Sequence, residues 1–452
     1  MIVQDALDRM QEVMSANGCH VASPDEAVKV VAPGHRVMIP IGSQPLALAD
    51  ALAAHIAGFA DGGSIEISHC AVGANYPWLP PGFPNVSKVV HEHWGGPAVR
   101  SQMRRHEHDY VPIPFGLRFK AAVDTNRPEA ELRRADVVLV QVSLPDEHGF
   151  VSFGPNAWNQ LRFVENATFA LAEMSPNVLP AFGESNVVHV SALHALVLND
   201  SPRRMSTPAS PTPERLAIAG YLSQIVRDGD TIQVGAGQAP TACVYAGAFD
   251  QKHDLGWHSE ATVGGLIDLI RSGVFNGYRK STDRGLAVAT GYSGNAEQME
   301  FARMHPFIHT RPTEYVHNLR VISSQENMLA INAALCMDFT GQIAADSIGT
   351  EMIGGTGGQL EFVIGALNAP NGRSVTLMES RALGGTTSTI VDLLPLGTVV
   401  TVPRQYADIV ITEYGVARLW AKSSRERAQE LISIAHPDFR GELRRRAVEL
   451  LG

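Results

Sequence analysis

Two glycine-rich segments and one glutamate are the residues of this chain whose types and spacing suggest chemistry. The segments are Val234-Gly235-Ala236-Gly237-Gln238-Ala239-Pro240 and Gly354-Gly355-Thr356-Gly357-Gly358-Gln359-Leu360-Glu361-Phe362. Glycines after a buried strand let backbone N–H groups approach a ligand closely and point the same way. Such groups bind phosphate or stabilise the oxyanion of a carbonyl under attack. Neither segment matches a P-loop or a dinucleotide-binding turn, and either one alone is more often a tight turn.

The glutamate, Glu260, lies between these segments and precedes a helical pattern. Apolar residues from Leu266 to Ile270 recur at helical spacing, and Gly273 is a plausible stop. We therefore expect Glu260 just ahead of the first helical turn or in it, where the positive end of the helix dipole favours an ionised carboxylate. Taken alone, its position is more typical of a helix-start glutamate with no chemical role.

Two histidine-rich pieces, His91-Glu92-His93 and His106-Glu107-His108, raise the question of a metal site. Alternating histidines on a strand point to one face and can bind zinc. The chain has no HExxH pattern, and no cysteine lies near these histidines in the sequence. We therefore expect histidines at the surface or at an interface, and no metal. The serine-hydrolase elbow is missing too, because Gly291-Tyr292-Ser293-Gly294-Asn295 has the wrong spacing.

The composition is that of a folded protein with a large interior. The chain has 452 residues, of which 45% are hydrophobic and 18% charged, so two or three globular domains are expected. The net charge of −10 disfavours a nucleic-acid-binding surface. The two short basic clusters, 203–204 and 444–446, are best interpreted as solvated surface.

Cysteine usage and apolar runs bear on the compartment. The four cysteines lie far apart with no CxxC pair, which is typical of buried free thiols in a reducing compartment: Cys19, Cys70, Cys243 and Cys336. The N-terminus shows no secretory signal, and no apolar run reaches 18 residues. We expect a cytoplasmic protein that does not bind a membrane.

A proline-rich stretch divides the chain. Residues 199–213 contain four prolines and several small polar residues, which exclude a helix or a central strand. We predict an N-terminal domain over residues 1–200, a linker over 201–213 and a C-terminal domain over 214–452.

The two halves resemble one another. A shift of 195 positions superposes Gly34 on Gly229, Gly42 on Gly237 and Pro45 on Pro240, with apolar strand positions between them. A second similarity relates residues 135–142 to residues 407–414, both β-branched runs that suit strands covered on both faces. Helical patterns at 46–57, 213–226 and 425–435 separate such runs. The prediction is α/β architecture: two similar domains with largely parallel sheets, produced by internal duplication.

Taken together, the motifs resemble the acetyl-CoA hydrolase/transferase family, which includes the 4-hydroxybutyrate, butyryl and succinyl CoA-transferases. The resemblance spans nearly the whole chain and is carried by these segments in order: Pro145–Ser152, Val234–Pro240, His258-Ser259-Glu260, Ile331–Leu335, Gly341-Gln342, Gly355–Phe362, Ile411–Ala417 and Ile434–Arg440.

The resemblance implies a coenzyme A transferase in which Glu260 is the nucleophile. CoA would pass from an acyl-CoA to a small carboxylate by ping-pong chemistry through anhydride and glutamyl-CoA thioester intermediates. The backbone N–H groups of Ala236 and of Gly357 or Gly358 are the implied oxyanion donors, and Asn332 the residue that orients the substrate. Substrate and CoA contacts are expected at Gly235, Gly237, Gln238, Asn332, Gly355, Gln359 and Glu361. The family also implies a homo-oligomer, with CoA as carrier and no metal or prosthetic group.

The chain departs from the family pattern at several positions. Ala261-Thr262-Val263-Gly264-Gly265 replaces the usual Met and Ser-Asp-Gly after the glutamate, and Glu361 replaces an aspartate. Thr389 replaces an arginine, which puts acetate as the acceptor in doubt, and Arg381 is a candidate to compensate. The small Ala261 and the glycines suggest a larger acyl pocket, so we expect a preference for medium-chain or aryl acyl-CoA over acetyl-CoA.

Two alternatives stay open at this level. The first is an acyl-CoA hydrolase, in which water resolves the same glutamyl intermediate. The second is a non-catalytic CoA-binding protein of the same fold, although a pure binder needs no nucleophile at position 260.

Overall fold

The computed structural model describes residues 11–12, 15, 21–60, 62–94, 99–119, 134–199, 211–355 and 357–452. The chain forms two compact units. Unit 1 contains residues 1–204 and 300–314, and unit 2 contains residues 205–299 and 315–452. The predicted linker at 201–213 lies largely outside the described residues, so this domain division stays a prediction. Among the described residues, no helix is both long enough and apolar enough to cross a bilayer.

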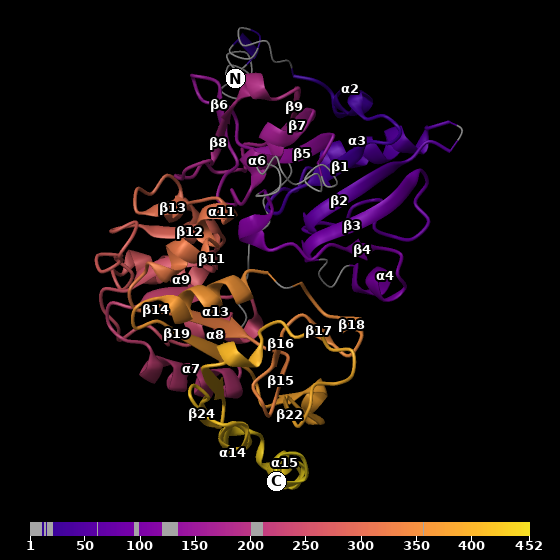
Figure 1. Ribbon diagram of the computed structural model, residues 1–452. Helices are drawn as coiled ribbons and strands as arrows, with labels where there is room; N and C mark the ends of the chain where they lie inside the picture. The colour runs from indigo at the N-terminus through magenta and orange to yellow at the C-terminus, as the bar shows by residue number, and fades with distance from the viewer. Residues whose placement is uncertain are drawn as a thin grey trace. The chain divides into compact units, whose positions relative to one another are not determined.

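Unit 1 is built on a parallel sheet of seven strands in the order β4-β3-β2-β1-β5-β7-β9 (Figure 1). Its strands are β1 (Arg36–Ile39), β2 (Ile65–Ala71), β3 (Val86–Trp94), β4 (Asp109–Tyr110), β5 (Val137–Val142), β7 (Phe169–Met174) and β9 (Ala195–Leu198), with a separate pair β6 (Phe150–Ser152) and β8 (Val187–His189) and the short β13 (Ile308–Thr310). Its α-helices are α2 (Pro24–Ala27), α3 (Leu46–Ala57), α4 (Arg100–Arg104) and α6 (Gln160–Asn166), and its 3₁₀ turns are η1 (Val28–Val30), η3 (Phe115–Leu117) and η5 (Val190–Ala192).

Unit 2 repeats this plan with strands in the order β12-β11-β10-β14-β19-β23-β24, all parallel except the last pair. The strands are β10 (Thr231–Val234), β11 (Gly256–Thr262), β12 (Ala287–Tyr292), β14 (Met328–Ala333), β19 (Arg373–Leu377), β23 (Ile409–Thr412) and β24 (Gly415–Arg418). Smaller sheets contain β15 (Cys336–Asp338), β16 (Ile343–Ala344) and β22 (Ile390–Val391); β17 (Ser347–Ile348) and β18 (Glu351–Met352); and β20 (Arg381–Ala382) and β21 (Thr387–Ser388).

The helices of unit 2 follow the strands in alternation. They are α7 (Pro213–Ile225), α8 (Gln238–Tyr245), α9 (Gly264–Arg271), α12 (Leu319–Ser323), α13 (Gln359–Asn368), α14 (Ser424–Ile434) and α15 (Pro437–Leu451), with η6 (Leu383–Gly385) and η7 (Arg404–Tyr406); α10 (Ala296–Ala302) and α11 (Thr313–Val316) each lie at a boundary between the units. The predicted helices at 46–57, 213–226 and 425–435 are α3, α7 and α14, and they agree to within a residue or so. The predicted α/β class with two similar, largely parallel domains is confirmed.

Local sequence signals explain where these elements begin. Thr212 caps α7, and Pro213 occupies its first turn. Ser423 and Glu426 form a reciprocal capping box at α14. Gly34 and Gly229 precede the central strands with φ of +87° and +79°, a backbone conformation that glycine adopts at little cost.

The sheet of unit 1 is covered on both faces, as parallel sheets require. Val37 and Ile39 of β1 pack in one apolar cluster with α3, whereas Met38 packs in another with α6. Because alternate side chains enter opposite clusters, the whole strand is apolar. This explains why continuous β-branched runs, rather than alternating ones, mark the strands of this sequence.

The first sequence similarity between the halves is structural. β1 and β10, 195 positions apart, are the equivalent central strands of the two sheets. The second similarity joins strands that are not equivalent, because β5 neighbours β1 whereas β23 lies two strands beyond the neighbour of β10. Two buried parallel strands share a composition whether or not they share an ancestor, so that similarity reflects burial.

The register of these strands relates individual residues of the two units. Arg36 pairs with Glu66 in unit 1, and the equivalent Thr231 pairs with Gly256 in unit 2. Four residues further along β2 and β11 lie Cys70 and Glu260, so Cys70 is the unit 1 equivalent of Glu260. Cys70 is buried, with its sulfur 3.9 Å from both Met38 Sδ and Glu92 Oε2.

The expectation of surface histidines is wrong for this part of unit 1. His91, Glu92, His93 and His108 are all buried, and of the four histidines in the two pieces only His106 is exposed. Sulfur, carboxylate and imidazole atoms of Cys70, Glu92 and His93 lie within 4.8 Å of one another, a spacing that raises the metal question again. However, Arg118 donates to both oxygens of Glu92, at 2.5 and 2.9 Å, and burial raises the pKa of the Cys70 thiol. A neutral thiol beside a paired carboxylate favours a closed ion pair over a metal site.

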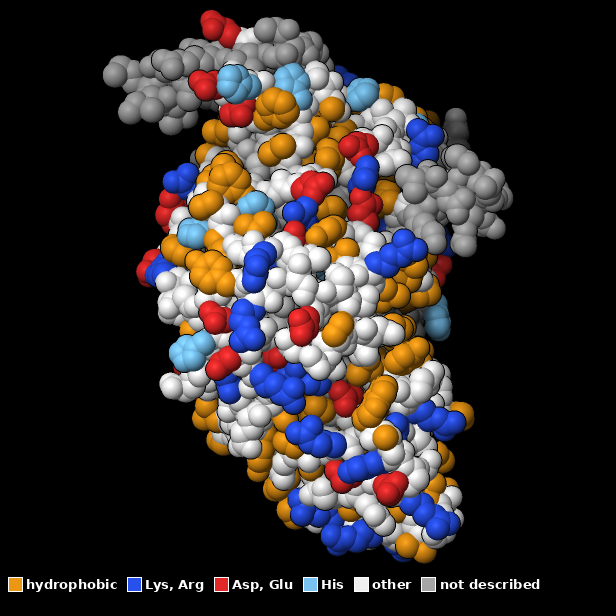
Figure 2. All heavy atoms as spheres, turned by 60° about the vertical axis from the view of Figure 1, so that its left-hand side comes forward, with side chains coloured by type: hydrophobic (Ala, Val, Ile, Leu, Met, Phe, Trp, Pro, Cys, Tyr) orange, Lys and Arg blue, Asp and Glu red, His pale blue; other side chains and the backbone are white. Residues whose placement is uncertain are grey.

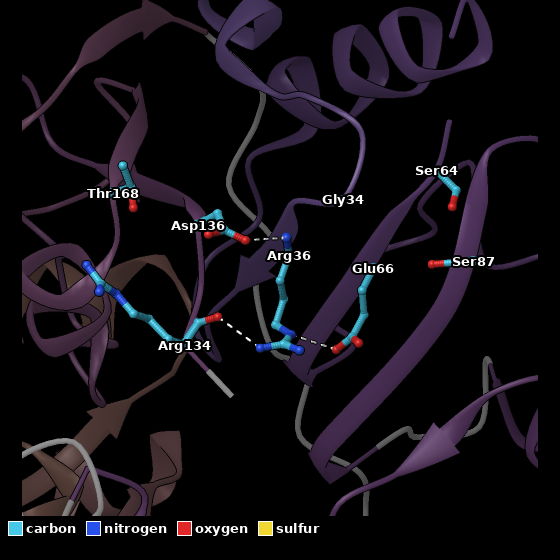
Figure 3. Close-up of a pocket in the computed structure, with 8 residues that line it drawn as sticks. All are labelled: Gly34, Arg36, Ser64, Glu66, Ser87, Arg134, Asp136 and Thr168. Carbon is cyan, nitrogen blue, oxygen red and sulfur yellow. Dashed lines mark hydrogen bonds and ion pairs between the residues drawn. The ribbon is translucent and has the colours of Figure 1, made fainter. Parts of the chain in front are cut away.

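A cavity of about 470 Å³ opens at the amino-terminal ends of the unit 1 strands. Figure 3 shows its charged lining. Arg36 Nε donates to Glu66 at 2.9 Å, Arg36 N–H donates to Asp136 at 2.8 Å, and Arg36 Nη1 donates to the Arg134 carbonyl at 3.0 Å. These charges compensate one another, and parallel α/β sheets bind ligands at the opposite, carboxyl edge. The cavity is therefore not the candidate site.

The basic clusters are surface features where they are described. In α15, Arg445 and Arg446 form ion pairs with Glu442, Glu449 and Asp392. Figure 2 shows acidic side chains beside basic ones over the face it presents. The cluster at 203–204 lies outside the described residues.

The buried histidines of unit 1 predict acid destabilisation. Burial, with the nearby charge of His108, lowers the pKa of His91 to about 3, from an ordinary value of 6.5 that applies when the chain is unfolded. The unfolded state therefore binds the proton first as pH falls, and the free energy of unfolding decreases below pH 6.5. Between pH 7 and pH 5 we expect a loss of about 2 kcal/mol from this group.

Urea unfolding at several pH values measures this loss. His91→Gln should flatten the pH dependence, whereas the neighbouring exposed His106→Gln should leave it unchanged. Equal slopes for wild type and His91→Gln would contradict the expectation.

Candidate active site

The carboxyl edge of the unit 2 sheet brings the sequence-predicted residues together. These strands are arranged in the order β12-β11-β10-β14-β19-β23. From β10 the chain first adds strands on one side of the sheet and then, from β14, on the other side. Open α/β sheets bind ligands at such a switch point, here between β10 and β14. The first glycine-rich segment follows β10, Asn332 lies near the end of β14, and Glu260 lies in the second half of β11.

Glu260 is a strand residue. β11 extends to Thr262, Val263 caps α9, and the helix begins at Gly264. The expectation that the dipole of this helix supports the carboxylate is therefore wrong. Ala261 and the β-branched Thr262 extend the strand past Glu260, and the apolar periodicity of α9 gave no information about that boundary.

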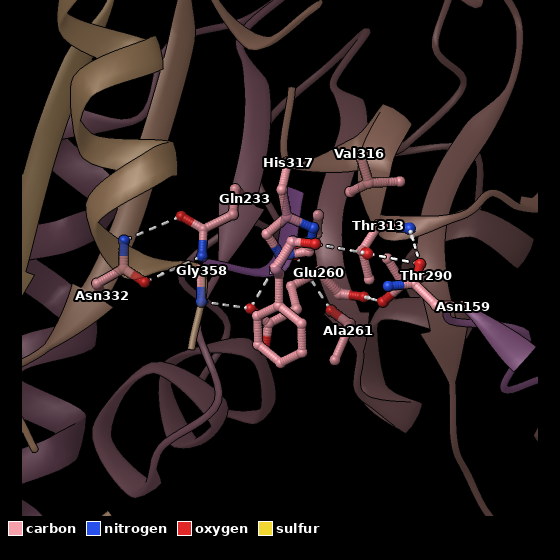
Figure 4. Close-up of polar contacts among 12 residues, drawn as sticks. Asn159, Gln233, Glu260, Ala261, Thr290, Thr313, Val316, His317, Asn332 and Gly358 are labelled. Carbon is pink, nitrogen blue, oxygen red and sulfur yellow. Dashed lines mark hydrogen bonds and ion pairs between the residues drawn. The ribbon is translucent and has the colours of Figure 1, made fainter. Parts of the chain in front are cut away.

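A different helix supports the carboxylate. Oε2 of Glu260 accepts the backbone N–H of Gly358 at 2.8 Å, and Gly358 is the N-cap of α13. His317 Nε2 lies 3.0 Å from the same oxygen. Because an ionised carboxylate only accepts hydrogen bonds, Nε2 carries the proton in this contact. Within the described residues, the other oxygen, Oε1, has no hydrogen-bond partner. Figure 4 shows this convergence.

Glycine at 358 is required by space. A Cβ at this position would lie 2.3 Å from His317 Cδ2 and 2.7 Å from Glu260 Oε2. The second glycine-rich segment therefore approaches the carboxylate closely at Gly358. Gly357 precedes it with φ of +51°, and Gly355 is half-buried. Thr356 lies outside the described residues.

His317 is the site residue that sequence reasoning missed. Its side chain is fully buried and packs edge-to-face on Phe362 of α13, with ring centroids 5.2 Å apart. It lies between two short helices, α11 and α12, with Asn318 capping the second. The only local signal is that cap, which does not distinguish this histidine from the other 16.

Each residue of His258-Ser259-Glu260 holds a different segment in place. His258 Nε2 lies 2.9 Å from the Val316 carbonyl, next to His317. Burial, together with the charge of Lys280, lowers the pKa of His258 to about 3, so this ring is neutral. Ser259 Oγ bonds the backbone of Val234, where the first glycine-rich segment begins. The tripeptide therefore positions both segments relative to Glu260.

Backbone contacts anchor the start of the first glycine-rich segment. Gly235 N–H donates to the Ile331 carbonyl at 2.8 Å, and a Cβ on Gly235 would lie 2.4 Å from Asn332 Oδ1. Ala236, Gly237 and Gln238 are exposed. Within the described part of the chain, the Ala236 N–H has no hydrogen-bond partner, so it is free to face a ligand.

The remaining predicted contact residues surround this edge. Asn332 exchanges two hydrogen bonds with Gln233, at 3.0 and 3.1 Å, beneath Gly235. Gln359 donates to the Ala333 carbonyl at 3.2 Å, and Glu361 lies half-buried in the first turn of α13. Their roles toward a substrate stay predictions.

Three of the positions that depart from the family pattern have structural explanations: Gly264, Gly265 and Thr389. Gly264 and Gly265 are closely packed, because Cβ atoms there would lie 2.4 Å from Gln298 and 2.8 Å from Tyr245. These glycines leave no space for a larger acyl group, so that part of the expectation is wrong, and only the part that rests on Ala261 remains. Thr389 is buried, and its hydroxyl donates to the Glu379 carbonyl at 2.7 Å.

Comparison with known proteins gives a consistent assignment. Residues 294–447 match the model of the acetyl-CoA hydrolase/transferase C-terminal domain. The chain is 36% identical to a 4-hydroxybutyrate coenzyme A transferase of Clostridium kluyveri over 68% of this chain and 71% of that one. It is 32% identical to a succinyl-CoA:cyclohexane-1-carboxylate CoA transferase of Geobacter metallireducens over 94% of each chain. The crystal structure of RipA from Yersinia pestis is similar, with a TM-score of 0.87 at 29% identity, covering 98% of this chain and 99% of that one.

Because Gly358 packs so closely, we predict that adding a single methyl group at this position destabilises the protein. Gly358→Ala should lower the free energy of unfolding by about 2 kcal/mol, because the methyl group displaces His317 and Glu260. Gly220→Ala is the matched control, since a Cβ there meets nothing within 4 Å and alanine favours the helix. Urea unfolding of both variants tests this, and an unchanged Gly358→Ala would contradict the described packing.

Proposed function

The chain belongs to the acetyl-CoA hydrolase/transferase family and is a CoA transferase, and on this basis we propose that Glu260 carries CoA between an acyl-CoA and a free carboxylate. One observation carries the assignment. Among the described residues Glu260 is held by its Oε2 alone, and its side chain is 16% exposed, so Oε1 is the oxygen available to attack.

The first half of the reaction loads the enzyme. Glu260 Oε1 attacks the thioester carbon of acyl-CoA, and the C–S bond breaks to give a mixed anhydride and the CoA thiolate. The thiolate then attacks the glutamyl carbon, which releases the acyl group as a carboxylate and leaves a glutamyl-CoA thioester. Splitting the transfer in this way replaces one difficult step with easier ones.

The second half reverses these steps with a new acid. The acceptor carboxylate attacks the glutamyl thioester and expels the CoA thiolate, which then attacks the acceptor carbon of the anhydride. The product is a new acyl-CoA, and Glu260 returns as a carboxylate. Each half consists of two displacements at carbonyl carbons, so no proton needs to be transferred to complete the cycle.

The contacts of Oε2 suit the intermediates formed on Glu260. When a nucleophile attacks the glutamyl carbon, charge develops on the oxygen that stays bound, and Gly358 N–H and His317 Nε2–H already point at Oε2. Donors placed in advance need no reorganisation as the charge develops. The Ala236 N–H is the proposed donor for the oxyanion on the acyl carbon, with Gly357 as an additional candidate.

The other parts of the proposal concern the substrate contacts, the carrier, the localisation and the oligomeric state. Gly235, Gly237, Gln238, Asn332, Gly355, Gln359 and Glu361 are proposed to contact acyl-CoA or the small carboxylate. CoA is the only proposed carrier, and a cytoplasmic homo-oligomer stays a prediction.

Acyl-CoA hydrolysis is the alternative, because the matching family description names hydrolases as well as transferases. In that case water, rather than a carboxylate, attacks the glutamyl thioester. Both reactions use Glu260, and they differ only in whether thioester loss requires an added carboxylate.

Replacing the nucleophile tests the assignment. Glu260→Gln keeps the shape but removes the attacking oxygen, so we expect the rate constant kcat to fall at least about 1000-fold. Wild type incubated with acyl-CoA and then hydroxylamine should carry a hydroxamate on the peptide that contains Glu260, detected by mass spectrometry, and the variant should not. Thioester loss should depend on an added carboxylate.

Different outcomes separate the alternatives. Carboxylate-independent loss would identify a hydrolase. The role of Glu260 would be rejected if no thioester in an acyl-CoA panel gave an adduct and wild type and Glu260→Gln were equally active. It would also be rejected if no thioester gave an adduct and both proteins were inactive.

His317 should act on kcat rather than on substrate affinity. His317→Leu removes one donor to Oε2, and we expect kcat to fall about 100-fold while the Michaelis constants change less than about threefold. His317→Gln, which retains an N–H donor, should recover part of the loss. His253→Leu is the control, since that side chain is exposed. A change confined to the Michaelis constants would argue that His317 does not support the intermediate.

A further inference from the structure

The proposed reaction needs the Ala236 amide in a fixed position, yet the segment that carries it is exposed. Ser259 and the Ile331 carbonyl hold only its start, at Val234 and Gly235. Beyond Gly235, three consecutive residues are exposed before α8 continues into the interior. A fixed donor requires a second anchor on the far side of Ala236.

Arg215 provides such a contact. Its Nη2 donates to Oε1 of Gln238, the first residue of α8, at 2.5 Å, and its Nε donates to Glu379 Oε1 at 2.8 Å. The Arg215 side chain is 14% exposed and that of Glu379 is 34% exposed. A guanidinium fixes two partners in one plane, which a lysine ammonium does not.

The partners of Arg215 are themselves held. Glu379 follows β19, and its carbonyl accepts the hydroxyl of Thr389. Arg215 lies in the first turn of α7, which Thr212 caps and Pro213 begins. Arg215 therefore links two fixed elements, α7 and the segment after β19, to the exposed Gln238 in the first glycine-rich segment.

We infer that Arg215 is a positioning residue that fixes the Ala236 amide through Gln238. This inference rests on the proposed function, because it assigns a purpose to Arg215 only if Ala236 serves as an oxyanion donor. It also gives a meaning to Thr389, which stands in the place of a family arginine. Its hydroxyl holds the backbone of Glu379, and the Glu379 carboxylate pairs with Arg215. A displacement of a reacting group by about 1 Å lowers the rate on the order of 100-fold. If the first glycine-rich segment were mobile, the reaction would therefore be much slower.

Steady-state kinetics of Arg215 and Gln238 variants tests this inference. Arg215→Gln should lower kcat about 10- to 100-fold and change the Michaelis constants for acyl-CoA and carboxylate less than about threefold. Gln238→Ala should lower kcat at least as much, since Gln238 is also a proposed substrate contact. The double variant should be no worse than Gln238→Ala, because both substitutions break one connection. Arg215→Lys should lie between wild type and Arg215→Gln.

Each other result overturns the inference. A raised Michaelis constant in Arg215→Gln would mean that Arg215 binds substrate directly, and additive losses in the double variant would mean that the two residues act separately. A lower melting temperature with unchanged kcat would mean a structural ion pair only. Arg271→Gln, which breaks a surface ion pair with Glu297, should leave kcat unchanged.

The proposed function is tested separately by Glu260→Gln. If Glu260→Gln remains active, the proposed function fails and the role of Arg215 fails with it. If Glu260→Gln is inactive while Arg215→Gln keeps full kcat, only the inference about Arg215 fails.

Discussion

A carboxylate that is mostly removed from water must be stabilised by donors, and this requirement organises unit 2. Glu260 is 16% exposed, so its charge depends on Gly358 and His317. The need for close approach explains why residue 358 lacks a side chain. The need for a fixed imidazole explains why a neutral His258 holds the neighbouring Val316. The carboxylate therefore determines the identity of residues on three separate elements.

The two units show how differently one architecture can be used. Both have the same strand order around a central strand, and the register makes Cys70 the equivalent of Glu260. In unit 1 the adjacent Glu92 is fully paired with Arg118, and the thiol is buried and protonated. The same strand position thus supports an accessible acid in one unit and a closed core in the other.

Local patterns predicted the scaffold well, and they failed where contacts are long-range. Helices α3 and α7 follow from proline and cap signals together with apolar spacing, all contained within a few residues. Burial was misjudged for His91 and His93, because a strand covered on both faces hides polar residues that look exposed in the sequence. The support of Glu260 was assigned to the wrong helix, since the donor belongs to α13, 98 residues away. His317 was missed for the same reason, and family resemblance singled out Glu260 but carried no information about this partner.

That separation along the chain has a consequence for biosynthesis. The two donors to Glu260 lie 57 and 98 residues downstream of it. During synthesis the acid emerges long before either donor exists, and contacts of such sequence separation form only after their loop-closure entropy has been overcome. The site around the proposed nucleophile is therefore completed late in maturation. A nascent or truncated chain that ends before α13 contains Glu260 but not both donors to its carboxylate.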